Sequence, residues 1–298
     1  MDAQLQTLIQ LVVIGLAWGS IYALIALGFV VIFKSTDIFN FAQGEIMMIG
    51  AYIAFSQVTF LRLPYVPAFL ITLGFISVLA ALLEMLVIRP MVGEPVFSVI
   101  MVTLGLGNIL RGAVGLVWGF DEYALPTPFP VNPLSLFGIT IQYGHLYTIL
   151  LTCALLAAFL LFFKYSNLGI AMRATAEDQE AAFLMGMSVK KIFTLSWVIA
   201  AIVAAIAGVF LAGVSYVKPV MSFTGLRALP AVILGGMDSI PGAILGGLII
   251  GVAENLAGFY LEDALGGGIQ EIAAYAIVIL IMMIRPYGLF GTQEIERV

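Results

Sequence analysis

Long runs of apolar residues, each close to the length of a membrane span, dominate the chain. A helix needs about 20 predominantly apolar residues to cross the hydrocarbon core of a bilayer. The first run contains no charged residue between Asp2 and Lys34. The pattern predicts an all-α polytopic membrane protein with about eight transmembrane helices, at residues 8–33, 38–61, 66–88, 96–119, 144–163, 192–217, 228–253 and 269–284.

Two of these runs are interrupted by polar or glycine-rich residues. The run 38–61 begins with the polar stretch Asn40 to Glu45, and the run 228–253 is broken by Gly235-Gly236-Met237-Asp238-Ser239-Ile240-Pro241-Gly242. Irregular backbone at membrane depth is tolerated only where protein shields it or where it lines a cavity. We therefore expect broken or re-entrant segments near 40–50 and within 228–253.

Two polar stretches lie between the apolar runs and set the expected orientation. Residues 120–143 are rich in proline, which disfavours a membrane helix, whereas residues 164–191 hold four of the basic residues. Basic loops face the cytoplasm. The sequence thus predicts one transmembrane domain over 1–298, with 164–191 as a cytoplasmic loop, 120–143 as an extracytoplasmic loop and the N-terminus outside.

The C-terminal side is less simple to place. Three simple crossings after residue 191 would leave Arg285 outside, against the positive-inside rule. A cytoplasmic tail requires a re-entrant hairpin or two half-crossings, and 228–253 is the best candidate. Both possibilities remain open at this point.

The composition excludes several classes of protein. Hydrophobic residues make up 62% of the chain and charged residues 10%, against about 25% charged in a soluble domain. These values, with a net charge of -5, exclude a soluble globular protein, a disordered chain and a nucleic-acid binder. One His and one Cys argue against a zinc or haem site, and no catalytic cluster is evident.

The cytoplasmic loop contains the signals of a short helix outside the membrane. Thr175-Ala-Glu-Asp178 fits a capping box with Thr175 as N-cap. Gly186 is placed to end the helix in the left-handed conformation. The apolar side chains of this helix suit either the groove of a partner protein or the lipid headgroups.

Several motifs along the chain together carry a family resemblance. Glu180-Ala181-Ala182, followed after three residues by Gly186, resembles the EAA loop of ABC importer permeases. The other motifs are Gly19 to Gly28, Asn40-Phe41-Ala42-Gln43-Gly44-Glu45, Gly169-Ile170-Ala171-Met172-Arg173-Ala174, Leu234 to Ala243, and Arg285-Pro286-Tyr287-Gly288-Leu289-Phe290-Gly291. In order and spacing they resemble the permeases of branched-chain (hydrophobic) amino acid ABC importers, specifically the shorter H-type subunit. Gln43 departs from the His that many members carry.

The resemblance implies a multi-pass permease domain in the bacterial cytoplasmic (inner) membrane. It implies three kinds of partner: a second, related permease, two ABC ATPase subunits and an extracytoplasmic substrate-binding protein. The chain lacks a Gly-x-x-x-x-Gly-Lys-Ser/Thr loop, so it is not expected to be an enzyme. It would bind no cofactor, and ATP and Mg²⁺ would be used by the partner ATPases. Coupling to the ATPase would involve Glu177, Asp178, Glu180, Ala181, Ala182, Phe183, Leu184 and Gly186.

The implied substrate is a branched-chain or other small amino acid. Alternatives are a same-family importer of urea, short amides or another small solute, and an ATPase-independent channel or ion-coupled transporter that uses Glu45 and Asp238. Polar residues within spans are costly and therefore functional candidates. The candidates for the substrate path are Asn40, Gln43, Glu45, Asn108, Asp238 and Ser239.

Each of these candidates also has a structural alternative. Glu45 can cap a re-entrant helix or pair with an arginine, and Asp238-Ser239 can form a simple cap before Pro241. Asn108 shares a helix face with Arg111 and suits an interface between permeases. Among the other acidic residues in spans, we expect Glu84 to snorkel or to pair, and we expect ordinary roles for Glu254 and Glu271.

Overall fold

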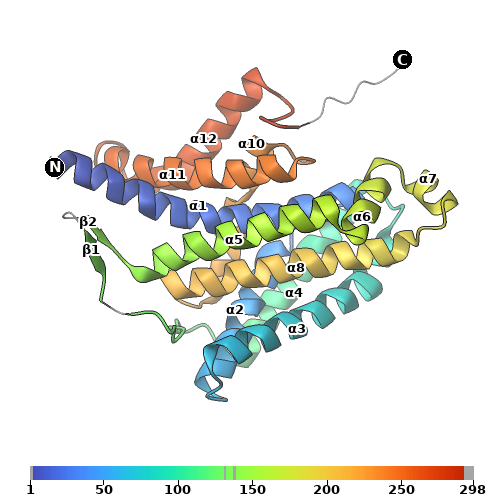
Figure 1. Cartoon of the computed structure of the whole chain (residues 1–298), viewed down its shortest axis with the longest axis horizontal. Coiled ribbons are helices and arrows are strands. Elements are labelled where there is room, and N and C mark those ends of the chain that lie inside the picture. The colour runs from blue at the N-terminus through green and yellow to red at the C-terminus, as the bar shows by residue number, and fades with distance from the viewer. Residues whose placement is uncertain (1–2, 131, 137–138, 292–298) are drawn as a thin grey trace. The chain divides into compact units, whose positions relative to one another are not determined.

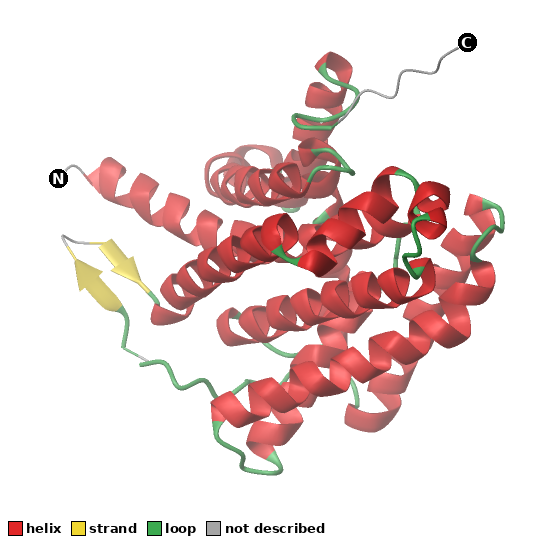
Figure 2. Ribbon diagram, turned by 45° about the vertical axis from the view of Figure 1, so that its right-hand side comes forward, coloured by secondary structure: helices red, strands yellow, loops and turns green. Residues whose placement is uncertain are grey.

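The computed structural model describes residues 3–130, 132–136 and 139–291. Helices form most of the described chain (Figure 2). The chain falls into two compact units: unit 1 comprises the described residues of 1–30, 129–153 and 227–298, and unit 2 comprises residues 31–128 and 154–226. Each unit is described below by itself.

The helices follow the apolar runs closely, with short additional elements between them (Figure 1). A π-helical turn, η1 (Glu84–Ile88), and a 3₁₀ turn, η2 (Arg89–Met91), follow α3, and a second 3₁₀ turn, η3 (Pro219–Ser222), precedes α9. The α-helices are α1 (Ala3–Thr36), α2 (Gln43–Thr59), α3 (Tyr65–Leu83), α4 (Val96–Trp118), α5 (Tyr143–Tyr165), α6 (Asn167–Glu177), α7 (Gln179–Leu184), α8 (Val189–Val214), α9 (Phe223–Arg227), α10 (Leu229–Gly235), α11 (Ile240–Leu265) and α12 (Ile269–Ile284).

Within the described residues, six helices are long and apolar enough to cross a membrane. Two shorter apolar stretches, Pro219–Gly235 and Ile269–Ile284, accompany them, and α2 has 17 residues. The polytopic all-α class is confirmed, while the expected count of eight spans is not. The stretch 120–143 contains a hairpin that the sequence did not predict, in which β1 (Leu134–Leu136) pairs antiparallel with β2 (Ile139–Ile141).

Both expected irregular regions are present. Residues 37–42 connect α1 and α2 without helix, and α2 is then continuous from Gln43. In the later region, α10 ends at Gly235 and α11 begins at Ile240, so the break lies at residues 236–239.

In unit 2, α2 packs into the protein interior. A Cβ added at Gly50 would lie 2.7 Å from the Cα of Ala205 on α8, and the backbone of Met47 similarly meets Gly208. Thirteen of the residues of α2 are buried, including Gln43 and Glu45. The weak hydropathy of the run 38–61 therefore reflects contact with protein, where polar side chains find partners.

In unit 1, α1 and α11 pack antiparallel through small residues. Gly15 lies against Val252, Gly19 lies against Gly247 and Leu248, and Asn255 donates to the carbonyl of Leu11 at 2.5 Å. Close backbone approach of this kind is what Gly-x-x-x-Gly patterns permit in membranes.

The packing of unit 1 shows where the chain after α12 ends relative to α1 and α11. Because α11 runs antiparallel to α1, its C-terminal end lies level with the N-terminal end of α1, and α12 then returns. The loop after α12 ends beside the start of α11, where the N–H groups of Leu289 and Phe290 donate to the carbonyls of Leu234 and Gly235 at 2.8 and 3.1 Å. Arg285 thus lies at the opposite end of unit 1 from Ala3, and the half-crossing before α11 stays a prediction.

We predict that Gly19→Ala lowers the stability of the protein. The new Cβ would lie 2.9 Å from the Gly247 carbonyl oxygen and from the Leu248 Cα, and these are backbone atoms that cannot move aside cheaply. Overpacking of this kind costs about 1–3 kcal/mol. The measurement is the melting midpoint of the detergent-solubilised protein, with unfolding monitored by tryptophan fluorescence.

Gly74→Ala is the matched control, because no atom lies within 4 Å of a Cβ at that position in α3. This control should melt at the wild-type temperature or slightly above it, since Ala is favoured over Gly in a helix by about 0.5–1 kcal/mol. Equal melting of both variants would contradict close packing of α1 on α11.

Candidate functional site

The first turn of α2 carries an acidic residue that is paired within the chain. Glu45 forms an ion pair with Arg111 of α4, and the Glu45 side chain is 7% exposed while that of Arg111 is 28% exposed. The Arg111 guanidinium also lies over the ring of Phe223 in α9, 4.3 Å from its centroid, a favourable cation–π geometry. The alternative in which Glu45 pairs with an arginine is the one that the structure shows.

The helix α4 is shaped to receive this carboxylate. A Cβ added at Gly107 would come within 3.2 Å of the carboxyl carbon of Glu45, so a glycine leaves the room that the carboxylate occupies. On the other side, Gly44 and Gly225 approach each other closely. The N-terminus of α2 is therefore enclosed by α4, η3 and α9.

Asn40 and Gln43 form a second polar group just before this ion pair. The Asn40 carbonyl oxygen accepts from the N–H of Ala42 at 3.1 Å, and its amide donates to the Gln43 side chain at 3.3 Å. The Gln43 amide in turn donates to the Ala200 carbonyl of α8 at 3.1 Å. Both residues are buried, so their amides hold the α1–α2 connection against α8.

The remaining path candidates lie elsewhere. Asn108 is on α4 with its side chain exposed. Ser239, in unit 1, is the N-cap of α11 and accepts from the N–H of Gly242 at 3.2 Å. Asp238 lies beside the C-terminal loop, where a Cβ at Gly291 would be 3.3 Å from its Oδ1. The structure thus joins Asn40 to Gln43 and pairs Glu45 with Arg111, and the role of all six candidates in a substrate path stays a prediction.

Glu254, for which the sequence predicts an ordinary role, is a buried carboxylate that connects two helices. Glu254 is 4% exposed and accepts a hydrogen bond from the hydroxyl of Tyr22 at 2.7 Å, linking α11 to α1. The start of α11 at Ser239-Ile240-Pro241 is the signal that was available, because it places Glu254 in the interior of a 26-residue helix. Glu271, in contrast, forms an ion pair with Arg227 at an exposed position.

The segment between α5 and α8 forms two short helices. Ser166 is the N-cap of α6 and accepts from the N–H of Gly169 at 2.9 Å. The expected helix start at Thr175 is wrong, since Thr175 is buried within α6. The earlier cap at Ser166 draws Thr175 into a continuous helix, and Asp178 starts α7 instead.

The caps of α7 fix both of its ends. The Asp178 carboxylate accepts from the N–H of Ala181 at 2.9 Å, as an N-cap does. At the other end, the N–H groups of Gly186 and Met187 donate to the carbonyls of Phe183 and Ala182 at 2.9 and 3.1 Å. With a φ of 84° at Gly186, this is the hydrogen-bond pattern of a Schellman motif. The predicted left-handed end at Gly186 is confirmed.

The helix α7 presents an apolar surface that the chain does not cover. The side chains of Phe183, Leu184 and Met185 are 67%, 78% and 82% exposed, whereas Ala182 is buried. A six-residue helix is far too short to be stable without such tertiary contacts and caps. Its geometry is therefore held by the chain while its apolar side chains remain available.

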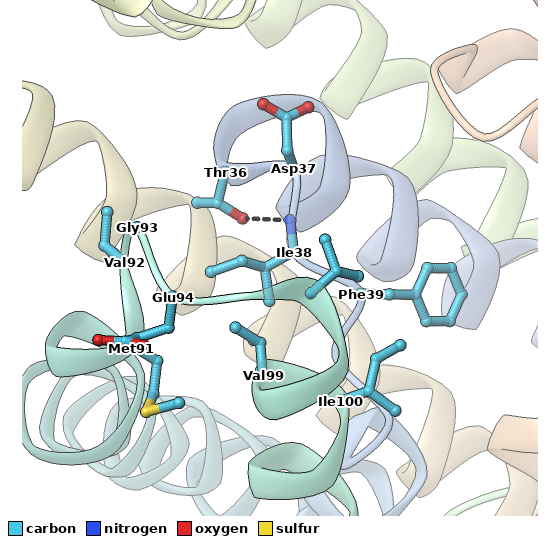
Figure 3. Close-up of a pocket in the computed structure, with 11 residues that line it drawn as sticks. Thr36, Asp37, Ile38, Phe39, Met91, Val92, Gly93, Glu94, Val99 and Ile100 are labelled. Atoms are coloured by element: carbon cyan, nitrogen blue, oxygen red, sulfur yellow. Dashed lines mark hydrogen bonds between the residues drawn. The ribbon is translucent and has the colours of Figure 1, made fainter.

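A small cavity of about 190 Å³ lies in unit 2, between the α1–α2 connection and the turn that joins α3 to α4 (Figure 3). The cavity floor includes the buried side chains of Ile38 and Val99. In the close-up, Asp37 and Ile38 lie on one side and Met91 to Glu94 on the other. The cavity is lined by Thr36, Asp37, Ile38, Phe39, Met91, Val92, Gly93, Glu94, Val96, Val99 and Ile100.

Comparison with known proteins decides the family. The family model described as "Branched-chain amino acid transport system / permease component" matches residues 11–285. The chain belongs to this family. The permease is similar over its full length to curated members, so the expected resemblance is confirmed.

Three relatives show the range of similarity. The high-affinity branched-chain amino acid transport system permease protein BraD of Pseudomonas aeruginosa is 36% identical, over 97% of this chain and 98% of its own. The corresponding LivH protein of Salmonella typhimurium is 33% identical over the whole of both chains. The probable branched-chain amino acid transport permease protein LivH of Methanocaldococcus jannaschii is 29% identical, over 92% and 90% of the two chains.

Among solved structures, "PsaBC from Streptococcus pneumoniae in complex with Fab" aligns with a TM-score of 0.47 at 15% identity, covering 94% of this chain and 91% of that one. The family of this permease and the six long apolar helices of its described residues identify it as a multi-pass transport protein of the bacterial cytoplasmic membrane.

We predict that Arg111→Met destabilises this permease more than the double change Glu45→Gln with Arg111→Met. The single change leaves the carboxylate of Glu45 buried without its cation, and breaking a buried pair costs about 3–5 kcal/mol. The partial exposure of Arg111 places the loss toward the lower end of that range. A double-mutant cycle on melting midpoints measures the difference.

The matched single variant Glu45→Gln completes the cycle. Additive effects of the two single changes would contradict a direct interaction between the two side chains. Recovery of stability in the double variant is the outcome that the ion pair predicts.

Proposed function

We propose that this permease imports branched-chain or other small amino acids, as part of a transporter driven by ATP hydrolysis in partner subunits. The proposed partners are a second, related permease, two ABC ATPase subunits and an extracytoplasmic substrate-binding protein. ATP and Mg²⁺ act in the ATPase subunits. The similarity to BraD and LivH over nearly the whole chain supports the substrate class, because both relatives are named for branched-chain amino acid transport.

The observation that carries the ATP-driven mechanism is the exposed apolar surface of α7. Phe183 and Leu184 project from a helix whose ends are fixed by Asp178 and Gly186. A short helix with a rigid backbone and an uncovered apolar face fits a groove on a partner protein. We assign the partner as the ATPase subunit.

The other coupling candidates lie beside the exposed side chains, in α7 or at the end of α6. Ala181 supplies the backbone N–H that Asp178 caps, and Ala182 is the buried side chain of α7. Glu180, in the first turn of α7, and Glu177, at the end of α6, are further coupling candidates. Since α8 begins at Val189, a displacement of α7 passes into a membrane span within a few residues.

We further propose that Asn108 and the Glu45–Arg111 pair line the substrate path. A polar side chain on the exposed face of a span is costly in lipid, and Asn108 occupies such a position on the same helix as Arg111. Asn40 and Gln43 would then position the start of α2 through their hydrogen bonds to each other and to α8. In unit 1, the broken helix at Asp238 and Ser239 resembles the helix interruptions that transporters use near the membrane midplane.

The ATPase-independent alternative has less support. A channel or ion-coupled transporter would need Glu45 as an available carboxylate, whereas Glu45 is paired with Arg111. Import of urea or a short amide stays within the family and differs only in substrate.

The proposed function is tested with the complex purified gently from native membranes through a tag on this chain. Mass spectrometry should identify a second permease and ATPase subunits. After reconstitution with the binding protein into liposomes that enclose ATP, radiolabelled leucine should accumulate, and a non-hydrolysable analogue should not support uptake. A chain that purifies alone and moves solute without ATP would contradict the proposal. ATP-driven uptake of urea but not of leucine would change the substrate.

We predict that replacing both Phe183 and Leu184 by alanine lowers ATP-driven leucine uptake by at least about tenfold. Exposed apolar side chains that anchor an interface typically contribute more than 1 kcal/mol each, and 1.4 kcal/mol corresponds to a factor of ten. The amount of permease inserted in the membrane should stay unchanged, as measured by immunoblotting of membrane fractions.

The matched control replaces Leu168 and Ile170 by alanine. Both side chains are 49% exposed and lie on α6 of the same segment. Uptake by this control should remain close to wild type. An equal loss in both double variants would contradict a specific docking role for α7.

A further inference from the structure

A polar cluster joins the turn η1 at the end of α3 to the second turn of α8. The Arg89 guanidinium donates to both carboxylate oxygens of Glu84, at 3.1 and 2.7 Å, and its Nη2 also donates to the hydroxyl oxygen of Thr194 at 2.8 Å. Thr194 Oγ1 lies 2.9 Å from Glu84 Oε2. The ion pair with Arg89 confirms the expectation that Glu84 pairs. Glu84 is 1% exposed, so its carboxylate is enclosed by protein.

The π-helical turn η1 makes this arrangement possible. In an α-helix, residues five apart are about 140° apart around the axis, which would point the side chains of Glu84 and Arg89 away from each other. Here the N–H of Arg89 donates to the carbonyl of Glu84, so the turn contains an extra residue and both side chains reach the same side. Such turns are rare and frequently lie at functional sites.

The hydroxyl of Thr194 has two acceptors and one proton. Thr194 Oγ1 lies 2.9 Å from the Glu84 carboxylate and 3.0 Å from the carbonyl oxygen of Lys190, one turn earlier in α8. A hydroxyl donates a single hydrogen bond while accepting others. The proton therefore bonds either across to Glu84 in η1 or back within α8, and the position of the first two turns of α8 relative to η1 decides which.

Apolar packing continues the same contact one turn further along α8. Trp197 belongs to a buried cluster with Ile88, the last residue of η1, and with Val99, Ile32, Ile38 and Ala200. Met91 of η2 packs against this cluster and also lines the cavity of about 190 Å³ shown in Figure 3. The segment η1–η2 thus has a polar and an apolar contact with α8, and free volume beside it.

We propose that Thr194 and the Glu84–Arg89 pair are positioning residues that transmit the movement of α7 and α8 to α3. The proposal rests on the proposed function, in which α7 docks on the ATPase subunit. A shift of the first two turns of α8 relative to η1 changes the partner of the Thr194 hydroxyl. The segment η1–η2 follows through Arg89 and Trp197, with the neighbouring cavity providing room.

The test uses Thr194→Val in the complete reconstituted complex. Valine keeps the branched shape of threonine and removes the hydroxyl. The quantities measured are the rate of ATP hydrolysis and the amount of leucine taken up per ATP hydrolysed. We expect uptake per ATP to fall about fivefold, in line with the net contribution of a typical intramolecular hydrogen bond, while ATP hydrolysis continues. Thr194→Ser, which keeps the hydroxyl, should restore the wild-type ratio.

Thr72→Val is the matched control. Thr72 is a buried residue of α3 whose hydroxyl donates to the carbonyl of Ala68 at 2.8 Å, within its own helix. This variant removes the same kind of intrahelical bond and leaves the hydrogen bonds among Glu84, Arg89 and Thr194 in place, so its uptake per ATP should equal that of wild type. Arg89→Lys provides a second test, since lysine keeps the charge but loses the bidentate geometry, and its ratio should also fall.

The outcomes separate this proposal from the proposed function. Wild-type uptake per ATP in Thr194→Val would overturn the proposal, and so would an equal loss in Thr72→Val. A wild-type complex that takes up leucine with ATP and loses uptake in the α7 double variant, but not in Thr194→Val, would preserve the proposed function alone. Absence of ATP-driven uptake in the wild-type complex would overturn both.

Discussion

The structure depends on one constraint: a polar group that enters the hydrocarbon region must find its partner within the protein. Three buried carboxylates satisfy this requirement in three ways. Glu45 is neutralised by Arg111, Glu84 by Arg89, and Glu254 accepts from the hydroxyl of Tyr22. Glu45 and Glu254 contact residues that are distant in sequence, and Glu84, whose cation lies five residues away, also contacts Thr194 of α8. The same groups that are costly in lipid therefore also determine which helices pack together.

Pairing within the chain changes how the polar residues are interpreted. A carboxylate that already has a cation is poorly suited to hold a substrate ammonium group by itself, and this applies to Glu45. Its pairing fits a wall of the path better than a free binding group. The exposed apolar surface of α7 is the complementary case, because Phe183, Leu184 and Met185 have caps and backbone support but no cover. The three buried carboxylates find partners within the chain, whereas this outward apolar surface is left for a partner protein.

Hydropathy and local chemistry predicted the features that depend on neighbouring residues. The apolar runs, the breaks near 40 and 236–239 and the left-handed Gly186 all follow from length, glycine content and capping preferences. Thr175 was misplaced because the competing cap at Ser166 extends α6 through it. The residues that required the fold are those paired over long distances. Arg111 lies 66 positions from Glu45, and Glu254 lies 232 positions from Tyr22. The π turn at Glu84–Ile88 cannot be seen in the hydropathy pattern, because it changes the direction in which side chains point and not the composition of the segment.

The most direct measurement is site-specific cross-linking from α7 in the intact complex. A Cys153→Ala background removes the single native thiol, and Leu184→Cys then carries a benzophenone maleimide on the exposed face of α7. Leu168→Cys, on α6, is the matched control. On illumination, the account predicts a cross-linked product that contains this permease and an ATP-hydrolysing subunit, formed from position 184 and not from position 168. Adducts with lipid alone from position 184, in a complex that still contains its ATPase subunits, would contradict it.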